Sequence, residues 1–116
     1  MFRLALFASG SGTNVQNICE YFQNHNSIKP EIVLSDKEDA YALERAKHLN
    51  VKSEYFNYIT TSSEVLLEKI KDRKVTHIIL AGYLRLVPSK IIKTFNSISE
   101  AQKILNLTNI SMCCNY

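Results

Sequence analysis

Short apolar segments alternate with segments that carry an apolar stripe at helical spacing, and this alternation constrains the fold more than any other feature. The apolar segments are residues 3–8, 32–34, 51–56 and 76–81. Their apolar residues are mostly continuous, as in strands that are buried on both faces of a sheet. Helices of about ten residues between such strands are typical of βαβ units. The sequence therefore predicts an α/β fold with a Rossmann-like parallel sheet and helices on both faces.

Four helices are predicted from apolar spacing and from their start signals. The apolar stripes are Val15, Ile18, Cys19 and Phe22, then Ala40, Leu43, Ala46 and Leu49, then Val65, Leu66 and Ile70, with a fourth helix over 89–95. Thr13 with Gln16, and Thr61 with Glu64, fit the capping box that begins a helix. Pro88 suits the first position of the fourth helix.

The length and a change of character near residue 97 indicate one domain and a tail. The chain has 116 residues, which is within the usual range for a single domain. We assign residues 1–96 to the α/β domain and residues 97–116 to a divergent, poorly ordered tail, because the segment from Asn106 is polar and patternless. Four strands followed by such a tail lead us to interpret the sheet as truncated.

The composition excludes several classes of protein. Apolar residues make up 46% and charged residues 22%, as in globular domains and unlike disordered or fibrous chains. Apolar runs are far shorter than the roughly 20 residues of a membrane span, and no signal peptide is predicted. A net charge of +3 from scattered basic residues gives no case for nucleic-acid binding. Three cysteines without metal-ligand spacing predict no metal site and a reducing, cytoplasmic setting, with Cys19 in the core.

The loop Ser9–Asn14 carries the strongest chemical signal. In a parallel sheet, ligands bind beyond the carboxyl ends of the strands, which here are followed by residues 9–14, 35–39 and 82–87. Glycine lets backbone N–H groups approach an anion, and the helix that follows directs its partial positive charge to the same place. We therefore predict a phosphate site in this loop. The alternative is a tight strand-to-helix connection that needs glycine only for its geometry.

A dinucleotide site and an apolar wall are the other interpretations of these loops. A dinucleotide fingerprint would require a third glycine at Val15, although Asp36 stands where a ribose-binding acid could lie. Residues 83–87 are apolar apart from one arginine, which suits a wall for a flat heterocycle or packing beneath the next helix. The three histidines have no partner spacing; we expect His48 on a solvated helix face and His77 to point outward.

Three motifs together resemble the phosphoribosylglycinamide formyltransferase family, whose members are folate-dependent enzymes of purine biosynthesis. They are LFASGSGTN at 6–14, VLSDKEDAYALERA at 33–46 and LAGYLRLVP at 80–88. Their order and spacing carry the resemblance, which covers about residues 2–96. It implies transfer of a formyl group from 10-formyltetrahydrofolate, as cosubstrate, to glycinamide ribonucleotide.

The resemblance also implies roles for single residues. The substrate phosphate is expected at Gly12, Thr13 and Asn14. The folate is expected beside Leu84, Arg85, Leu86 and Val87.

The sequence departs from the family at several places. The family usually has asparagine where this chain has Asp36, and its catalytic Asn-Ile-His-Pro segment is only faintly echoed up to Asn106. No catalytic residue is therefore assigned, and we expect no formyl transfer by this chain alone. A non-catalytic nucleotide-phosphate binding module and an NAD-binding Rossmann domain remain the alternatives, and the oligomeric state stays open.

Overall fold

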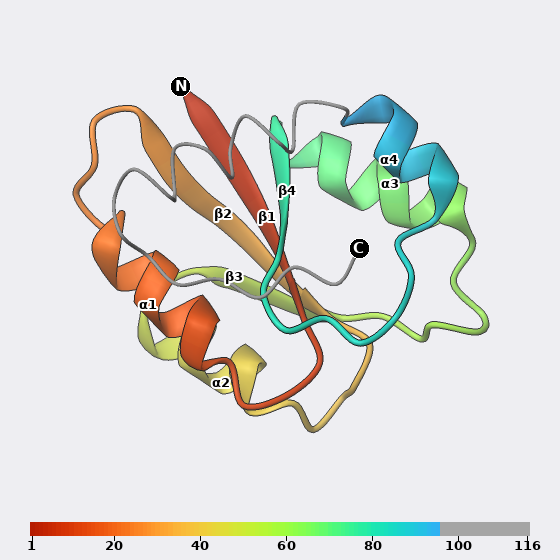
Figure 1. The fold of residues 1–116 in the computed structure, drawn as a ribbon, viewed down its shortest axis with the longest axis horizontal. Coiled ribbons are helices and arrows are strands. Elements are labelled where there is room, and N and C mark those ends of the chain that lie inside the picture. Colours follow the sequence, from red (N-terminus) through yellow and green to blue (C-terminus); the bar gives the residue numbers. More distant parts are fainter. Residues whose placement is uncertain (96–116) are drawn as a thin grey trace.

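The structure, a computed structural model, describes residues 1–95, which form four strands and four helices in alternation (Figure 1). The strands are β1 (Phe2–Ala8), β2 (Ile28–Ser35), β3 (Lys52–Tyr55) and β4 (His77–Leu80). The helices are α1 (Thr13–Tyr21), α2 (Tyr41–His48), α3 (Ser63–Asp72) and α4 (Ser89–Thr94). The predicted boundary at residue 96 and the predicted tail at 97–116 lie outside the described residues.

The strands form one parallel sheet in the order β3-β2-β1-β4. The predicted Rossmann-like parallel sheet is thereby confirmed. Because the chain extends the sheet outward from β1 to β3 and then returns to the other side of β1, the strand order reverses between β1 and β4. Ligands in such sheets bind in the crevice at this reversal, beyond the carboxyl ends of the strands.

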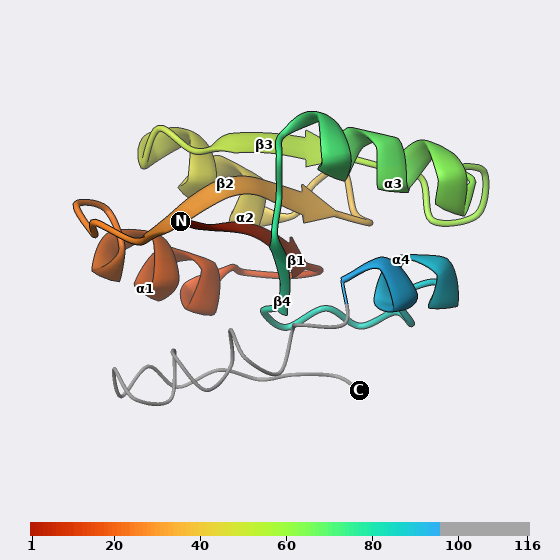
Figure 2. The same cartoon turned by 90° about the horizontal axis from the view of Figure 1, so that it is seen from above.

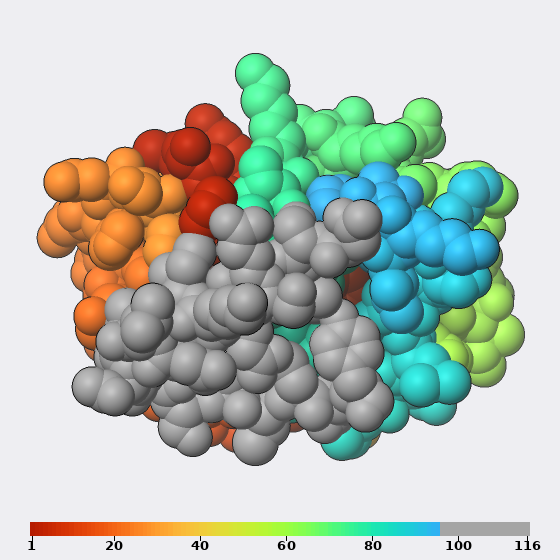
Figure 3. Space-filling view, turned by 45° about the horizontal axis from the view of Figure 1, so that its top comes forward, coloured from red at the N-terminus to blue at the C-terminus, as the bar shows by residue number. Residues whose placement is uncertain are grey.

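Helices cover both faces of the sheet, as the sequence predicts (Figure 2). Leu4, Leu6 and Ala8 of β1 pack with α1 and α2, whereas Ala5 and Phe7 pack with α3 and α4. This alternation explains why β1 is apolar at every position from 4 to 8. Figure 3 shows α4, in blue, beside α3, in green, and Lys90 of α4 donates to Glu64 of α3 at 2.7 Å.

β2 begins at Ile28, four residues before the predicted strand. Leu4 pairs with Pro30 and Ala5 with Ile32, so the register shifts and Glu31 is the extra residue of a bulge. Proline cannot donate to a ladder, and a bulge is one of the few places in a sheet that tolerates it. The charged and proline residues of this bulge interrupt the apolar run, which is why the pattern predicted only 32–34.

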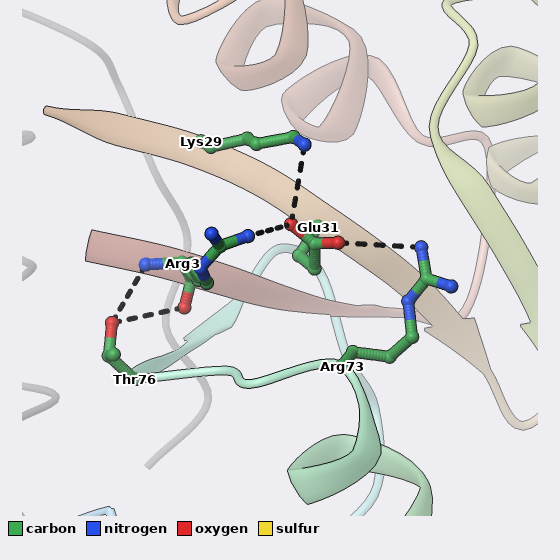
Figure 4. Close-up of polar contacts among 5 residues, drawn as sticks. All are labelled: Arg3, Lys29, Glu31, Arg73 and Thr76. Atoms are coloured by element: carbon green, nitrogen blue, oxygen red, sulfur yellow. Dashed lines mark hydrogen bonds and ion pairs between the residues drawn. The ribbon is translucent and has the colours of Figure 1, made fainter. Parts of the chain in front are cut away.

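Glu31 is also the centre of an ion cluster (Figure 4). Its carboxylate oxygens form ion pairs with side-chain nitrogens of Arg3 at 3.1 Å, Lys29 at 3.7 Å and Arg73 at 3.4 Å. These partners come from β1, from β2 and from the residue after α3. The bulge therefore presents one nearly buried acid that links three elements at the amino-terminal edge of the sheet.

Three predicted helix starts are wrong by one residue. α1 is capped by the backbone of Gly12 and makes no side-chain cap bond, so Thr13 and Gln16 form no capping box. At α3 the cap is Ser62, whose Oγ accepts from the backbone N–H of Val65 at 3.2 Å. Pro88 is the N-cap of α4 rather than its first residue. Val65 of α3 is 46% exposed, so its predicted inward orientation is also wrong.

No helix within residues 1–95 has the length and apolar content that a membrane crossing requires.

Candidate functional site

The loops that follow β1 and β4 line an open cavity of about 250 Å³ at the carboxyl edge of the sheet. It lies at the reversal of strand order, where the topology predicts a ligand. Its lining consists of residues from both loops: Gly10, Ser11, Gly12, Thr13, Asn14, Ala81, Gly82 and Leu84. We call residues 9–14 the phosphate loop, after the predicted ligand. The structure brings its three predicted phosphate-binding residues, Gly12, Thr13 and Asn14, together with Leu84. Arg85, Leu86 and Val87 are not part of this lining.

The phosphate-loop side of the cavity is the beginning of α1. The first N–H groups of a helix lack partners within the helix, and its amino end carries partial positive charge. Thr13 is exposed and Asn14 is half-buried, and both face the cavity. This end of the site can therefore offer backbone donors and two polar side chains to an anion.

Gly12 is required by the fold as well as by any ligand. Its φ is 78°, in the left-handed region that favours glycine. A Cβ built at this position would lie 2.5 Å from the Cα of Ala42 and 2.7 Å from its Cβ. The backbone of the loop also contacts α2 directly, because the Ala42 N–H donates to the Gly10 carbonyl at 3.1 Å.

Arg45 is a residue of this site that the sequence analysis missed. Its Nε donates to the Ser11 carbonyl at 2.6 Å, and its Nη1 donates to Oε1 of Gln16. The guanidinium lies over the Tyr41 ring, 4.8 Å from the centroid. Arg45 thus fixes the phosphate loop from α2 and adds positive charge near it. Its place in an amphipathic helix gave no signal of this contact, which depends on how α2 packs against the loop.

The second loop is anchored by Tyr83 and exposes its leucines. The Tyr83 ring is buried edge-on against Phe7, with centroids 5.3 Å apart, and burial raises the pKa of its hydroxyl. Leu84 is 70% exposed and Leu86 is 76% exposed, whereas Val87 packs partly against the core. The two exposed leucines are compatible with the predicted apolar wall for a flat ring. Val87 instead packs inward, as the alternative interpretation of this loop predicted.

Asp36 does not present its carboxylate to the cavity. Its side chain is 0% exposed; Oδ1 accepts from the Ser9 hydroxyl at 2.7 Å and Oδ2 accepts from Arg85 at 3.2 Å. A ribose-binding acid has to offer its oxygens to the ligand. The arrangement disfavours the NAD interpretation.

The three histidines lie away from this edge. His25 follows α1, His48 ends α2 and His77 begins β4, all toward the amino-terminal ends of the strands. His48 is exposed, as predicted, but His77 is buried, so the prediction that it points outward is wrong. The centroid of the His77 ring lies 4.6 Å from that of the Phe2 ring.

Neither thiol nor metal chemistry is evident in the part of the chain that the structure describes. Cys19 is buried in the core, as predicted, and this burial raises the pKa of its thiol to about 12. Among residues 1–95 no group of three histidine, cysteine or acidic side chains could hold a metal ion.

Comparisons of the sequence and of the structure with known proteins all find formyltransferases. The sequence matches the formyl transferase family model over residues 2–107. Phosphoribosylglycinamide formyltransferase of Dictyostelium discoideum is 30% identical over 91% of this chain and 58% of its own length. The enzyme of that name from Haemophilus influenzae is 31% identical, covering 92% of this chain and 51% of its own. The crystal structure of glycinamide ribonucleotide transformylase 1 from Geobacillus kaustophilus has a TM-score of 0.76 at 31% identity, over 84% of this chain and 55% of that one. The chain spans about half the length of the curated relatives it matches.

Proposed function

This chain belongs to the formyl transferase family, and we propose on that basis that it binds glycinamide ribonucleotide and 10-formyltetrahydrofolate. The family resemblance predicted from the three motifs is confirmed by the relatives. The proposed reaction moves a formyl group from the folate to the amine of the ribonucleotide. Gly12, Thr13 and Asn14 would hold the phosphate, and the loop from Leu84 to Val87 would contact the folate.

The observation that carries the proposal is the shared cavity. The amino end of α1, which can offer donors to an anion, and an exposed leucine line the same space, which supports the binding of a phosphate ester beside an apolar ring. Arg45 supports the phosphate end because it adds a positive charge behind the loop. The proposed cytoplasmic setting is supported by the relatives, which are metabolic enzymes.

Formyl transfer needs more than these two binding loops. Attack by an amine forms a tetrahedral oxyanion and releases a proton, so a site requires a donor to the oxygen and an acid/base group. Residues 1–95 bring no histidine to the carboxyl edge. Loss of a general acid/base group typically lowers the rate by about 10²–10⁴-fold. We therefore expect this chain alone to transfer formyl groups at least about 100-fold more slowly than a full-length relative, and an assay of the two purified proteins tests this expectation.

Calorimetric titration with glycinamide ribonucleotide tests the phosphate site. Thr13→Val and Asn14→Ala each remove a polar group from the cavity lining, and each should raise the Kd about tenfold. Asn17→Ala is the matched control, because Asn17 is exposed on the same helix outside the cavity lining. An equal Kd for all three variants, or no binding by the unmodified chain, would contradict the proposed site.

A non-catalytic phosphate-binding module is the second candidate, since the anion-binding end of α1 alone would serve it. Binding of a folate analogue separates the two functions. The proposed formyltransferase binds it beside Leu84, weakly, with a Kd above about 1 µM because the described residues form only one wall. A pure phosphate module does not bind it at all.

A further inference from the structure

We propose that Ser9 and Asp36 are positioning residues that couple the phosphate subsite to the loop 82–87. This proposal rests on the proposed function only for the identity of the two ligands. The coupling itself is a property of the hydrogen bonds that join the ends of β1, β2 and β4. A ligand bound at one loop then changes the position, and so the affinity, of the other loop.

Ser9 is the connection between the two loops. It is buried at the end of β1, directly before the glycines of the phosphate loop. Its Oγ accepts from the backbone N–H of Leu84 at 2.9 Å, and its own backbone N–H donates to the Gly82 carbonyl at 3.3 Å. The same residue therefore precedes one wall of the cavity and binds the backbone of the other wall.

Asp36 orients the Ser9 hydroxyl. The hydroxyl has one proton, and it donates that proton to Oδ1 of Asp36 at 2.7 Å. Its lone pairs then face the Leu84 N–H, so the hydrogen bonds run in one direction from Leu84 through Ser9 to Asp36. A charged acceptor strengthens such a chain.

Asp36 also fixes the charged residue of the loop. Its Oδ2 accepts from Nε of Arg85 at 3.2 Å, and the Arg85 guanidinium lies over the Tyr58 ring, 4.8 Å from the centroid. The Asp36 carboxylate is fully buried, whereas Arg85 is half-exposed. Two consecutive residues of the loop, Leu84 and Arg85, are thus bound through one buried carboxylate on β2's carboxyl end.

The chemistry of the carboxylate makes the link sensitive to one atom. A carboxylate offers only acceptors, so it can bind the Ser9 hydroxyl and the Arg85 Nε–H at the same time. Asparagine at this position keeps the shape but offers one acceptor and two donors. In Asp36→Asn the amide oxygen can accept from Arg85 only if the amide NH2 faces Ser9, so the Ser9 proton loses its acceptor and the direction of the hydrogen bonds is lost. Ser9→Ala removes the connection to the Leu84 N–H altogether.

The test follows backbone amides of the full chain by NMR during titration with glycinamide ribonucleotide. In the unmodified chain the Leu84 amide should shift together with the amides of Thr13 and Asn14, and its hydrogen exchange should slow at least about fivefold on saturation. In Ser9→Ala and in Asp36→Asn the Thr13 and Asn14 amides should still shift, while Leu84 exchange responds less than about twofold. Glu38→Gln is the control, because this exposed acid lies in the same loop as Asp36.

Each outcome decides one claim. Equal responses of Leu84 in the unmodified chain and in both variants would overturn the coupling. If no amide of the phosphate loop shifts, the proposed ligand is wrong. The hydrogen bond between the Leu84 N–H and Ser9 is then tested without ligand: hydrogen exchange of the Leu84 amide should be at least about tenfold faster in Ser9→Ala than in Glu38→Gln. Equal exchange rates in that comparison would refute the link independently. Asp36→Asn is isosteric and serves if Ser9→Ala does not fold.

Discussion

Replacing Gly12 with alanine should destabilise the fold by about 2–5 kcal/mol, through two separate costs. The left-handed backbone, with φ at 78°, costs an L-residue roughly 1–2 kcal/mol. The new Cβ would lie 2.5 Å from the Cα of Ala42, a contact with backbone that cannot be relieved by a side-chain rotation. Overpacking of this kind typically costs about 1–3 kcal/mol.

Urea unfolding followed by far-ultraviolet circular dichroism measures this loss. Gly10→Ala is the matched control, because a Cβ at Gly10 meets nothing within 4 Å and its φ lies outside the left-handed region. The control should lose less than about 1 kcal/mol. If both variants lost the same amount, the argued contact between the phosphate loop and α2 would be refuted. For the same reason, substitutions at Gly12 cannot test phosphate binding, because they disturb the fold first.

Three further predictions concern the supports of the site and core. Arg45→Met should lower the free energy of unfolding by about 1 kcal/mol in urea, because the bond to the Ser11 carbonyl is lost; a stability equal to the unmodified chain would contradict this contact. With the other two cysteines replaced by serine, Cys19 should react with a thiol reagent at pH 8 at least about tenfold more slowly than in urea. Fast reaction of the folded chain would contradict this burial. Burial raises the pKa of the Cys19 thiol from 9.0 to about 12, so the neutral thiol's contribution to the free energy of unfolding is full below pH 9 and falls as the pH rises toward 12. Leu66→Ala should cost about 2–5 kcal/mol and Val65→Ala less than about 1, whereas equal losses would contradict the observed face of α3.

Local burial patterns explain why so much of the fold could be predicted. A strand such as β4 is apolar at Ile78, Ile79 and Leu80 because helices cover both of its faces. Burial on both faces produces a continuous apolar run, which can be recognised in the sequence. The bulge at Glu31 could not be predicted in this way. Its position depends on pairing with Leu4 and Ala5, which lie far away in the sequence. The start of α3 was misplaced for a different reason, since Thr61 and Ser62 both suit a cap and only the backbone geometry distinguishes them.

The candidate site was predictable where backbone chemistry defines it. Gly12 and the residues after it belong to a glycine-rich pattern that by itself indicates an anion site. The supports of the site were not predictable, because Arg45 and Asp36 act through contacts between loops that only the packed sheet brings together. Asp36 in particular fits a ribose-binding position in sequence, yet its carboxylate is enclosed by Ser9 and Arg85.

A crystal structure of the chain with glycinamide ribonucleotide shows directly where the phosphate binds. Phosphate oxygens should lie within hydrogen-bond distance of the backbone N–H groups of Thr13 and Asn14, with the ligand extending toward Leu84. A phosphate bound instead at the cationic cluster around Glu31, on the opposite edge of the sheet, would contradict this expectation. A chain that crystallises without bound ligand at saturating ribonucleotide would contradict it equally.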